Sequence, residues 1–212
     1  MGIAMARRVA LCTAFQPELD TLRAGLQPAY IGATVHAFAA GIGLVDAAIG
    51  VTRTLHRDGP FDALVFVGTC GAFAESARGT VVLPSSARLV QPCALRGEAE
   101  LVEHQAVDAD PSLLRELSVA PSDGAVATVI GVTVHEARAA LLADTGAAFE
   151  HLEAYAVLRA ASAVGVPAAC VLGVSNRVGA TGRAEWRAHR QEVEARAAKV
   201  VDRWLRSLAS VS

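Results

Sequence analysis

The stretch from Val171 to Trp186, VLGVSNRVGATGRAEW, passes from an apolar segment into a polar pair and then into a glycine-containing loop. The apolar segment, Ala168 to Val174, has the continuous hydrophobicity of a buried parallel strand. Ser175 and Asn176 follow it directly. Because ligands in open α/β sheets bind beyond the carboxyl ends of the strands, this stretch predicts an α/β protein with a ligand pocket at this strand end.

Two other predicted strands end in segments of similar character. Ala63 to Val67 is continuously apolar and is followed by Gly68-Thr69-Cys70-Gly71, which we interpret as a turn. Arg8 to Ala14 leads into a short helix that carries Glu18 in its first turn. The carboxyl ends of parallel strands meet at one edge of a sheet, so we expect these three ends and Glu153 to form one pocket.

Strands and helices alternate along the rest of the chain. Helical spacing of apolar residues, together with glycine and proline breaks, separates the helices from the strands. The pattern predicts an α/β fold with a largely parallel sheet in a single domain covering residues 1–212. Further strands are expected at Val35–Ala40, Thr80–Pro84, Ser86–Val90 and Ala125–Val134, helices at about Pro17–Leu26, Leu44–His56, His135–Ala143, Leu152–Val164 and Arg183–Leu208, and a polar surface excursion at Gln91–Leu114.

Composition excludes several classes of partner. The chain has 212 residues and a formal net charge of −2, which gives no field that would favour nucleic acid or an anionic membrane. No apolar run reaches the roughly 18 residues of a membrane span. Four widely spaced cysteines, Cys12, Cys70, Cys93 and Cys170, lack metal-site spacing and predict buried free thiols in a cytoplasmic protein. We expect no metal and no other cofactor.

Familiar nucleotide and hydrolase motifs are missing. Gly41-Ile42-Gly43 lacks the third glycine of a dinucleotide fingerprint, so its glycines either permit a tight turn or bring the backbone close to a ligand. The sequence contains neither a P-loop GxxxxGK[ST] nor the GxSxG of a nucleophile elbow. These absences argue against NAD, nucleoside triphosphates and serine-hydrolase chemistry.

Three polar residues have both a structural and a functional interpretation. Glu18 is either an exposed acid at a helix start, favoured by the helix dipole, or a group that orients a water molecule. Glu153 is either an exposed helix residue or a carboxylate that accepts hydrogen bonds from ligand hydroxyls. Asn176 is either a strand-terminating residue or a donor and acceptor for a ligand. His135 and His151 flank the candidate pocket, and we expect each to have a structural role.

Five segments together resemble the nucleoside phosphorylase and nucleosidase superfamily over nearly the whole chain. The segments with Glu18 and Glu153 are similar to those of methylthioadenosine/S-adenosylhomocysteine nucleosidases. The last segment looks most like futalosine hydrolases, whose strand ends in SN and continues VGxRDxxxW, although Thr181-Gly182-Arg183 does not spell RD. The five are AFQPELDTL (14–22), GIGLVDAAIGVT (41–52), VFVGTCGAF (65–73), HLEAYAVLRAA (151–161) and VLGVSNRVGATGRAEW (171–186).

The resemblance implies a three-layer fold, with a central mixed sheet forming a distorted barrel between helices, in a homodimer or larger assembly. It also implies cleavage of an N-glycosidic bond to a purine-like base. Glu18 would position and deprotonate a water molecule, Glu153 would bind the ribose 2′- and 3′-hydroxyls, and Asn176 would bind the departing base at N7 and its 6-oxo group. Other substrate contacts would come from Leu152, which replaces the family's usual Met, and from Thr69, Cys70, Gly71, Ser175 and Trp186.

These roles predict hydrolysis of a 6-oxopurine nucleoside, with futalosine as the favoured substrate. Two alternatives stay open. A phosphorylase would need arginines to hold phosphate, and Phe66 stands where hexameric purine nucleoside phosphorylases carry one, which favours water. A nucleoside-binding protein without turnover is the other alternative, with Asn176 marking a lost acid. In each case the partner is a small nucleoside.

Overall fold

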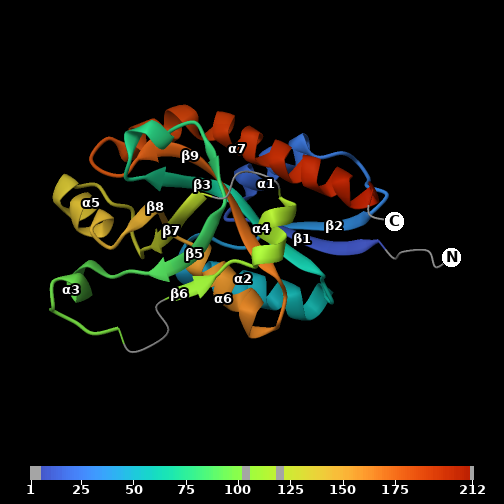
Figure 1. Cartoon of the computed structure of the whole chain (residues 1–212), viewed down its shortest axis with the longest axis horizontal. Helices are drawn as coiled ribbons and strands as arrows, with labels where there is room; N and C mark the ends of the chain where they lie inside the picture. The colour runs from blue at the N-terminus through green and yellow to red at the C-terminus, as the bar shows by residue number, and fades with distance from the viewer. Residues whose placement is uncertain (1–5, 102–105, 118–121, 211–212) are drawn as a thin grey trace.

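A nine-stranded mixed sheet runs through the centre of the computed structural model, which describes residues 6–101, 106–117 and 122–210 (Figure 1). Seven strands follow the order β2-β1-β3-β8-β7-β5-β6, and β9 pairs with both β3 and β4. The strands are β1 (Arg7–Thr13), β2 (Ala33–Ala39), β3 (Ala63–Ala72), β4 (Val81–Val82), β5 (Pro84–Leu89), β6 (Ala106–Asp108), β7 (Ser122–Thr128), β8 (Ala147–His151) and β9 (Ala168–Arg177).

The sheet closes on itself because one continuous segment contains two strands, β4 and β5, that pair with different parts of the sheet. β4 and β5 are separated by Leu83 alone, yet β4 pairs with β9 and β5 pairs with β7. Since β9 pairs with β3, β3 with β8, and β8 with β7, the pairing closes into a ring. The β1–β2, β1–β3, β3–β9, β5–β7 and β7–β8 pairs are parallel, whereas β3–β8, β4–β9 and β5–β6 are antiparallel. The predicted mixed sheet in a distorted barrel is therefore confirmed.

Helices cover both sides of the sheet, which gives the three predicted layers. Figure 1 shows α7 and α1 above the sheet and α2 and α6 below it. In agreement, α7 packs against α1 and β9, and α2 packs against α6. The helices are α1 (Gln16–Gly25), α2 (Gly43–Asp58), α3 (Pro92–Leu95), α4 (Pro111–Glu116), α5 (Glu136–Ala143), α6 (Ala154–Ala163) and α7 (Gly182–Ser207), with 3-10 turns at Glu75–Ala77 and Leu208–Ser210.

The long helix α7 supplies one wall of the core. Val193, Ala197, Val201 and Trp204 recur at helical spacing and are each at most 2% exposed. They bury an apolar stripe against the sheet, chiefly against β9. None of the helices within the described ranges is long and apolar enough to cross a bilayer.

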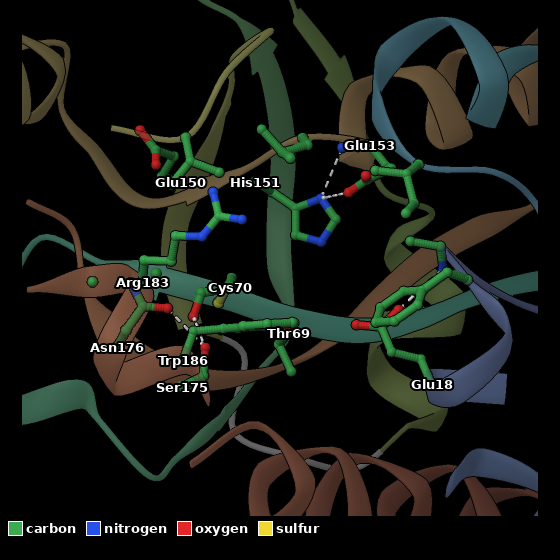
Figure 2. Close-up of a pocket in the computed structure, with 17 residues that line it drawn as sticks. Glu18, Thr69, Cys70, Glu150, His151, Glu153, Ser175, Asn176, Arg183 and Trp186 are labelled. Carbon is green, nitrogen blue, oxygen red and sulfur yellow. Dashed lines mark hydrogen bonds and ion pairs between the residues drawn. The ribbon is translucent and has the colours of Figure 1, made fainter. Parts of the chain in front are cut away.

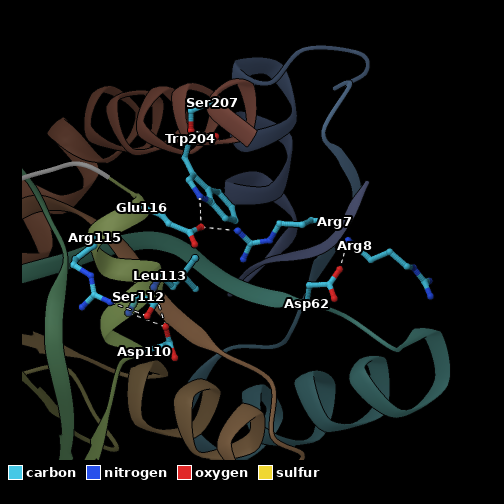
Figure 3. A network of polar contacts seen from close by, with 10 residues as sticks. All are labelled: Arg7, Arg8, Asp62, Asp110, Ser112, Leu113, Arg115, Glu116, Trp204 and Ser207. Carbon is cyan, nitrogen blue, oxygen red and sulfur yellow. Dashed lines mark hydrogen bonds and ion pairs between the residues drawn. The ribbon is translucent and has the colours of Figure 1, made fainter. Parts of the chain in front are cut away.

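A polar cluster ties α4 to β1 and α7 at the edge away from the pocket (Figure 3). Glu116 Oε2 accepts hydrogen bonds from Arg7 Nη1 at 2.6 Å and from Trp204 Nε1 at 3.2 Å. Asp110 caps α4 by accepting from the backbone N–H groups of Ser112 and Leu113. These contacts satisfy the indole N–H of the buried Trp204.

Several predicted boundaries are wrong, and most of them lie near the pocket. The segment Gly68–Gly71 belongs to β3 and is no turn; a register shift against β9 between Cys70 and Gly71 accommodates it. The helix predicted from Leu152 begins at Ala154, and residues 147–151 form the unpredicted strand β8. The strand predicted at 125–134 ends at Thr128. The excursion predicted at 91–114 contains α3, β6 and the start of α4, while 102–105 lie outside the described residues.

Candidate active site

A cavity of about 340 Å³ opens at the carboxyl ends of β1, β3 and β9. All nine residues that the sequence singled out line it: Glu18, Thr69, Cys70, Gly71, Leu152, Glu153, Ser175, Asn176 and Trp186. Figure 2 shows Glu18 and Glu153 on one side of this pocket and Asn176 on the other. The chain thus brings together two acids and an amide that are far apart in sequence.

Glu18 is a buried carboxyl in the first turn of α1. It is 5% exposed, so the exposed helix-start interpretation is wrong. Its Oε2 accepts a hydrogen bond from the Ala14 backbone N–H at 3.1 Å. Burial raises the pKa of Glu18 to about 8, with further contributions from the charges of Glu194 and Glu153, while the Ala14 bond and Arg190 oppose the shift. Glu18 is therefore a stronger base than an ordinary carboxylate.

Glu153 is the N-cap residue of α6 and is 4% exposed, so it does not lie on an exposed helix surface. Its Oε1 accepts from the Gly43 backbone N–H at 2.6 Å, which joins the glycine turn at Gly41–Gly43 to the pocket. Gly41 and Gly43 both have positive φ angles, 123° and 80°, that favour glycine. The turn therefore does more than reverse the chain: it delivers a backbone donor to the carboxylate.

His151 lies at the end of β8 and packs edge-on against Phe66, with ring centroids 5.2 Å apart. Its Nδ1 accepts from the backbone N–H groups of Glu153 at 2.9 Å and Ala154 at 3.1 Å. Burial lowers the pKa of His151, so we assign a neutral ring with its proton on Nε2. The 3.1 Å approach of Glu153 Oε2 to Nδ1 is then a contact between two acceptors and no true ion pair. The ring fixes the start of α6, and its Nε2–H has no partner among the described residues.

Side chains on β3, β9 and α7 hold the opposite wall. Thr69 Oγ1 accepts from Trp186 Nε1 at 3.0 Å. The Ser175 hydroxyl lies 3.2 Å from the Cys70 carbonyl oxygen and 2.8 Å from Asn176 Oδ1, so its single proton is shared between them. Asn176 Nδ2 donates to the Arg177 carbonyl oxygen at 2.9 Å. Asn176 is therefore held in one orientation before any ligand arrives.

Two glycines make room for the Asn176 amide. A Cβ atom on Gly71 would lie 2.9 Å from Asn176 Nδ2 and 2.8 Å from Val178 Cγ2. A Cβ atom on Gly182 would lie 3.0 Å from the same Nδ2. The glycines of this region therefore serve the close approach of a side chain and the backbone.

The loop after β7, residues 129–135, forms part of the pocket wall and is held in place by Glu150. Glu150 was not among the site residues predicted from the sequence. Glu150 accepts from the Thr133 backbone N–H at 3.1 Å and from the Thr133 hydroxyl. Burial raises the pKa of Glu150, while the bonds from Thr133 oppose the shift. Arg138 Nη2 also donates to the Gly131 carbonyl oxygen at 2.8 Å. These contacts place Val132 in the pocket wall.

Eight further residues line the pocket: Ala14, Phe15, Ile42, Val132, Glu150, His151, Gly182 and Arg183. Arg183 stands out because its sequence neighbourhood departs from the futalosine hydrolase pattern, yet its side chain enters the same cavity. Within the described residues, no three His, Cys, Asp or Glu side chains gather as a metal site would require. All four cysteines are free thiols, and Cys12, Cys70 and Cys170 are buried.

Fold and pocket together define an α/β protein with a small-molecule site at the carboxyl ends of its strands. The chain belongs to the Phosphorylase superfamily, whose family model matches residues 7–206. Comparison with curated proteins gave no significant match.

Solved structures with the same fold include three informative neighbours. A 5′-methylthioadenosine/S-adenosylhomocysteine nucleosidase from Neisseria meningitidis, in complex with methylthio-immucillin-A, has a TM-score of 0.81 and 16% identity, covering 95% of this chain and 99% of that one. The nucleosidase from Colwellia psychrerythraea 34H, in complex with adenine, has a TM-score of 0.82 and 19% identity, covering 96% of each chain. Futalosine hydrolase of Helicobacter pylori has a TM-score of 0.80 and 12% identity, covering 97% and 98%.

Proposed function

We propose that this protein hydrolyses the N-glycosidic bond of a 6-oxopurine nucleoside. The favoured substrate is futalosine, which would yield hypoxanthine and dehypoxanthine futalosine for menaquinone biosynthesis. The observation that carries the proposal is the convergence of Glu18, Glu153 and Asn176 on one pocket. A nucleoside would lie across it with its base toward Asn176 and its ribose toward Glu153 and Glu18, in keeping with the two sides seen in Figure 2.

Glu18 would act as the general base. Water is a weak nucleophile, and a carboxylate with a raised pKa accepts its proton more readily than an ordinary one. The water oxygen bonds to the anomeric carbon, the water's proton passes to Glu18, and the electron pair of the C–N bond leaves with the base. The base then takes up a proton, so that the products are neutral.

Glu153 and His151 would hold the sugar. A carboxylate has about four acceptor positions, and Gly43 fills only one of those on Glu153. The others can accept from the 2′- and 3′-hydroxyls as the ribose gains positive charge, and such contacts strengthen toward the transition state. The free Nε2–H of His151 offers a donor to the same hydroxyls.

The distribution of cations in the pocket supports water over phosphate as the acceptor. Arg183 is the only arginine among the described lining residues, and Figure 2 places it on the Asn176 side, away from Glu18. Arg190 lies outside the lining, against the rings of Phe15 and Trp186 at 5.8 and 5.1 Å, and pairs with Glu194 at 3.2 Å. A phosphate dianion beside Glu18 would thus meet a carboxyl group and no pocket-lining arginine.

Base release from three nucleosides tests the proposal. Futalosine, inosine and methylthioadenosine would each be incubated with the protein in buffer with and without phosphate, and the free base quantified. We expect hypoxanthine release from futalosine at equal rates in both buffers. Release that requires phosphate would point to a phosphorylase. Thermal stabilisation by a nucleoside without any product would point to a binding protein without turnover.

We also propose that two copies associate next to the pocket, as the family resemblance implies. Val45 and Ile49 of α2 are 67% and 56% exposed, and Ile42, at 58%, also lines the pocket. Ile130, Val132 and Val134 of the loop after β7 are exposed as well. Such apolar groups beside one pocket mouth are typical of an interface.

The free thiols support the expected cytoplasmic location.

Introducing acids into this surface is expected to separate the subunits. The double variant Val45→Glu/Ile49→Glu would place two charges in the proposed interface, where they cannot be solvated. Light scattering after gel filtration should then give the mass of one chain in place of two or more. Leu95→Glu, at an exposed apolar residue of α3, is the matched control and should leave the mass unchanged. A wild-type protein that runs as a monomer would contradict the proposed interface.

A further inference from the structure

The amide of Asn176 can offer only one hydrogen bond to a base. An amide nitrogen carries two protons, and one of those on Nδ2 is already donated to the Arg177 carbonyl oxygen at 2.9 Å. Oδ1 receives the Ser175 hydroxyl at 2.8 Å. A 6-oxopurine presents two neighbouring acceptors, N7 and O6, on the edge that Asn176 would face. One donor therefore remains to be supplied by another residue.

Arg183 is placed to supply it. It lies in the first turn of α7, next to Gly182, whose backbone packs against the Asn176 amide. Figure 2 shows its side chain extending from the Asn176 side of the pocket toward the centre. It forms no hydrogen bond or ion pair with any described residue. By contrast, nearby Arg177 is paired with Glu136 at 2.5 Å.

Glu150, which Figure 2 shows on the same side of the pocket as Arg183, does not neutralise this cation. Glu150 is bound through both carboxyl oxygens to Thr133, and no contact joins it to Arg183 within the described residues. Arg183 lines the pocket but is exposed to solvent, so its unpaired guanidinium is available to an electron-rich or anionic group on the ligand. The leaving base becomes such a group, because the electron pair of the broken C–N bond passes into its ring.

We propose that Arg183 is a catalytic residue that donates to O6 of the departing 6-oxopurine while Asn176 donates to N7. This inference rests on the proposed function and names the residue that selects the base. The guanidinium keeps its protons throughout: it stabilises the purine anion, which is protonated by solvent on release, while the proton of the attacking water goes to Glu18. A 6-aminopurine presents an N–H group where O6 would be, so it would oppose the guanidinium donor.

Substitutions of Arg183 distinguish a specific hydrogen bond to O6 from a general effect of the positive charge. In Arg183→Met, kcat/KM for a hypoxanthine nucleoside should fall about 10²–10³-fold, the usual cost of removing one donor to a developing anion. The 6-amino analogue should lose far less, so the preference for the 6-oxo base should fall by at least about tenfold. Arg183→Lys keeps the charge but not the planar donor and should fall between the two. Arg187→Met, an exposed arginine one turn along α7 and outside the pocket lining, is the matched control.

Calorimetric binding of free hypoxanthine gives a readout that needs no turnover. The dissociation constant should rise at least about tenfold in Arg183→Met and stay unchanged in Arg187→Met. Equal hypoxanthine affinity in all three proteins, or an equal loss on 6-oxo and 6-amino substrates, would overturn the inference. A wild-type protein that binds hypoxanthine through Arg183 but releases no base would overturn the proposed function and retain the assigned contact. Because Arg183 is exposed, unchanged thermal melting will show that the variant is folded.

Discussion

Replacing Glu18 with glutamine is expected to lower the rate of base release by about 10²–10⁴-fold, the usual contribution of a positioned general base. The amide keeps the size of the side chain but cannot take a proton from water. In the wild-type protein, kcat/KM should rise with pH, reach half of its maximum near pH 8 and level off about one pH unit above that, because burial raises the pKa of Glu18 to about 8. Initial rates of hypoxanthine release between about pH 5 and 10 measure both effects.

The same substitution should stabilise the fold at alkaline pH. The unfolded chain would lose the Glu18 proton near 4.5, whereas the folded chain keeps it until about pH 8. The folded state thus binds more protons between these values, and stability falls as the pH rises through them. Glu18→Gln removes this loss, so its Tm should exceed that of the wild type most above pH 8 and least below pH 5. Asp20→Asn, at an exposed acid of the same helix, should change neither rate nor Tm. A fully active Glu18→Gln protein would contradict the assigned role.

Replacing Glu153 with alanine is expected to cost about 10²–10³-fold in kcat/KM for a ribonucleoside, because hydrogen bonds to the sugar hydroxyls strengthen in the transition state. The decisive comparison uses the 2′-deoxy analogue of the substrate. Removing the 2′-hydroxyl should slow the wild-type protein strongly but add little to the loss in Glu153→Ala, since the partner of that hydroxyl is already missing. The four kcat/KM values form a double-mutant cycle between protein and substrate.

Two control measurements accompany this comparison. Glu153 also accepts from Gly43 N–H, so its removal loosens the glycine turn, and thermal melting of the variant will show how far. Glu150→Gln changes a neighbouring carboxyl whose oxygens are bound to Thr133, and it should keep the wild-type ratio of ribose to deoxyribose rates. If Glu153→Ala kept that ratio too, Glu153 would not be the ribose-binding carboxylate.

The alternation of strands and helices and the strand ends that form the pocket could be predicted because both depend on local hydrophobic pattern, whereas the three layers were implied by the family resemblance. The prediction failed where pairing between distant segments determines the secondary structure. The sequence pattern predicted no element at residues 147–151, but they form β8 because β7 and β3 provide partners. The glycines in GTCG looked like a turn, whereas Gly71 lies in a strand and admits the Asn176 amide. Turn-like composition cannot distinguish these uses.

The roles of Glu150 and Arg183, and the partners of His151, for which only a structural role was expected, could not be inferred from sequence for a related reason. A lone polar residue has no periodic signal, and its partners come from other parts of the chain. Glu150 meets Thr133 across the loop after β7, and His151 meets backbone N–H groups at the start of α6. The sequence predicted three of the site residues because they follow strand ends or lie in segments that resemble the family: Glu18, Glu153 and Asn176. Their assigned roles in catalysis stay predictions.

The most direct test of the account is hydrolysis of futalosine in phosphate-free water enriched in ¹⁸O, followed by mass spectrometry of the sugar product. If Glu18 activates water at the anomeric carbon, one ¹⁸O atom will appear on that carbon in product that is quenched before its hemiacetal oxygen exchanges with solvent, and free hypoxanthine will form in equal amount. Addition of phosphate will not change the product. A sugar phosphate formed only when phosphate is present, or the absence of any released base, would contradict the account.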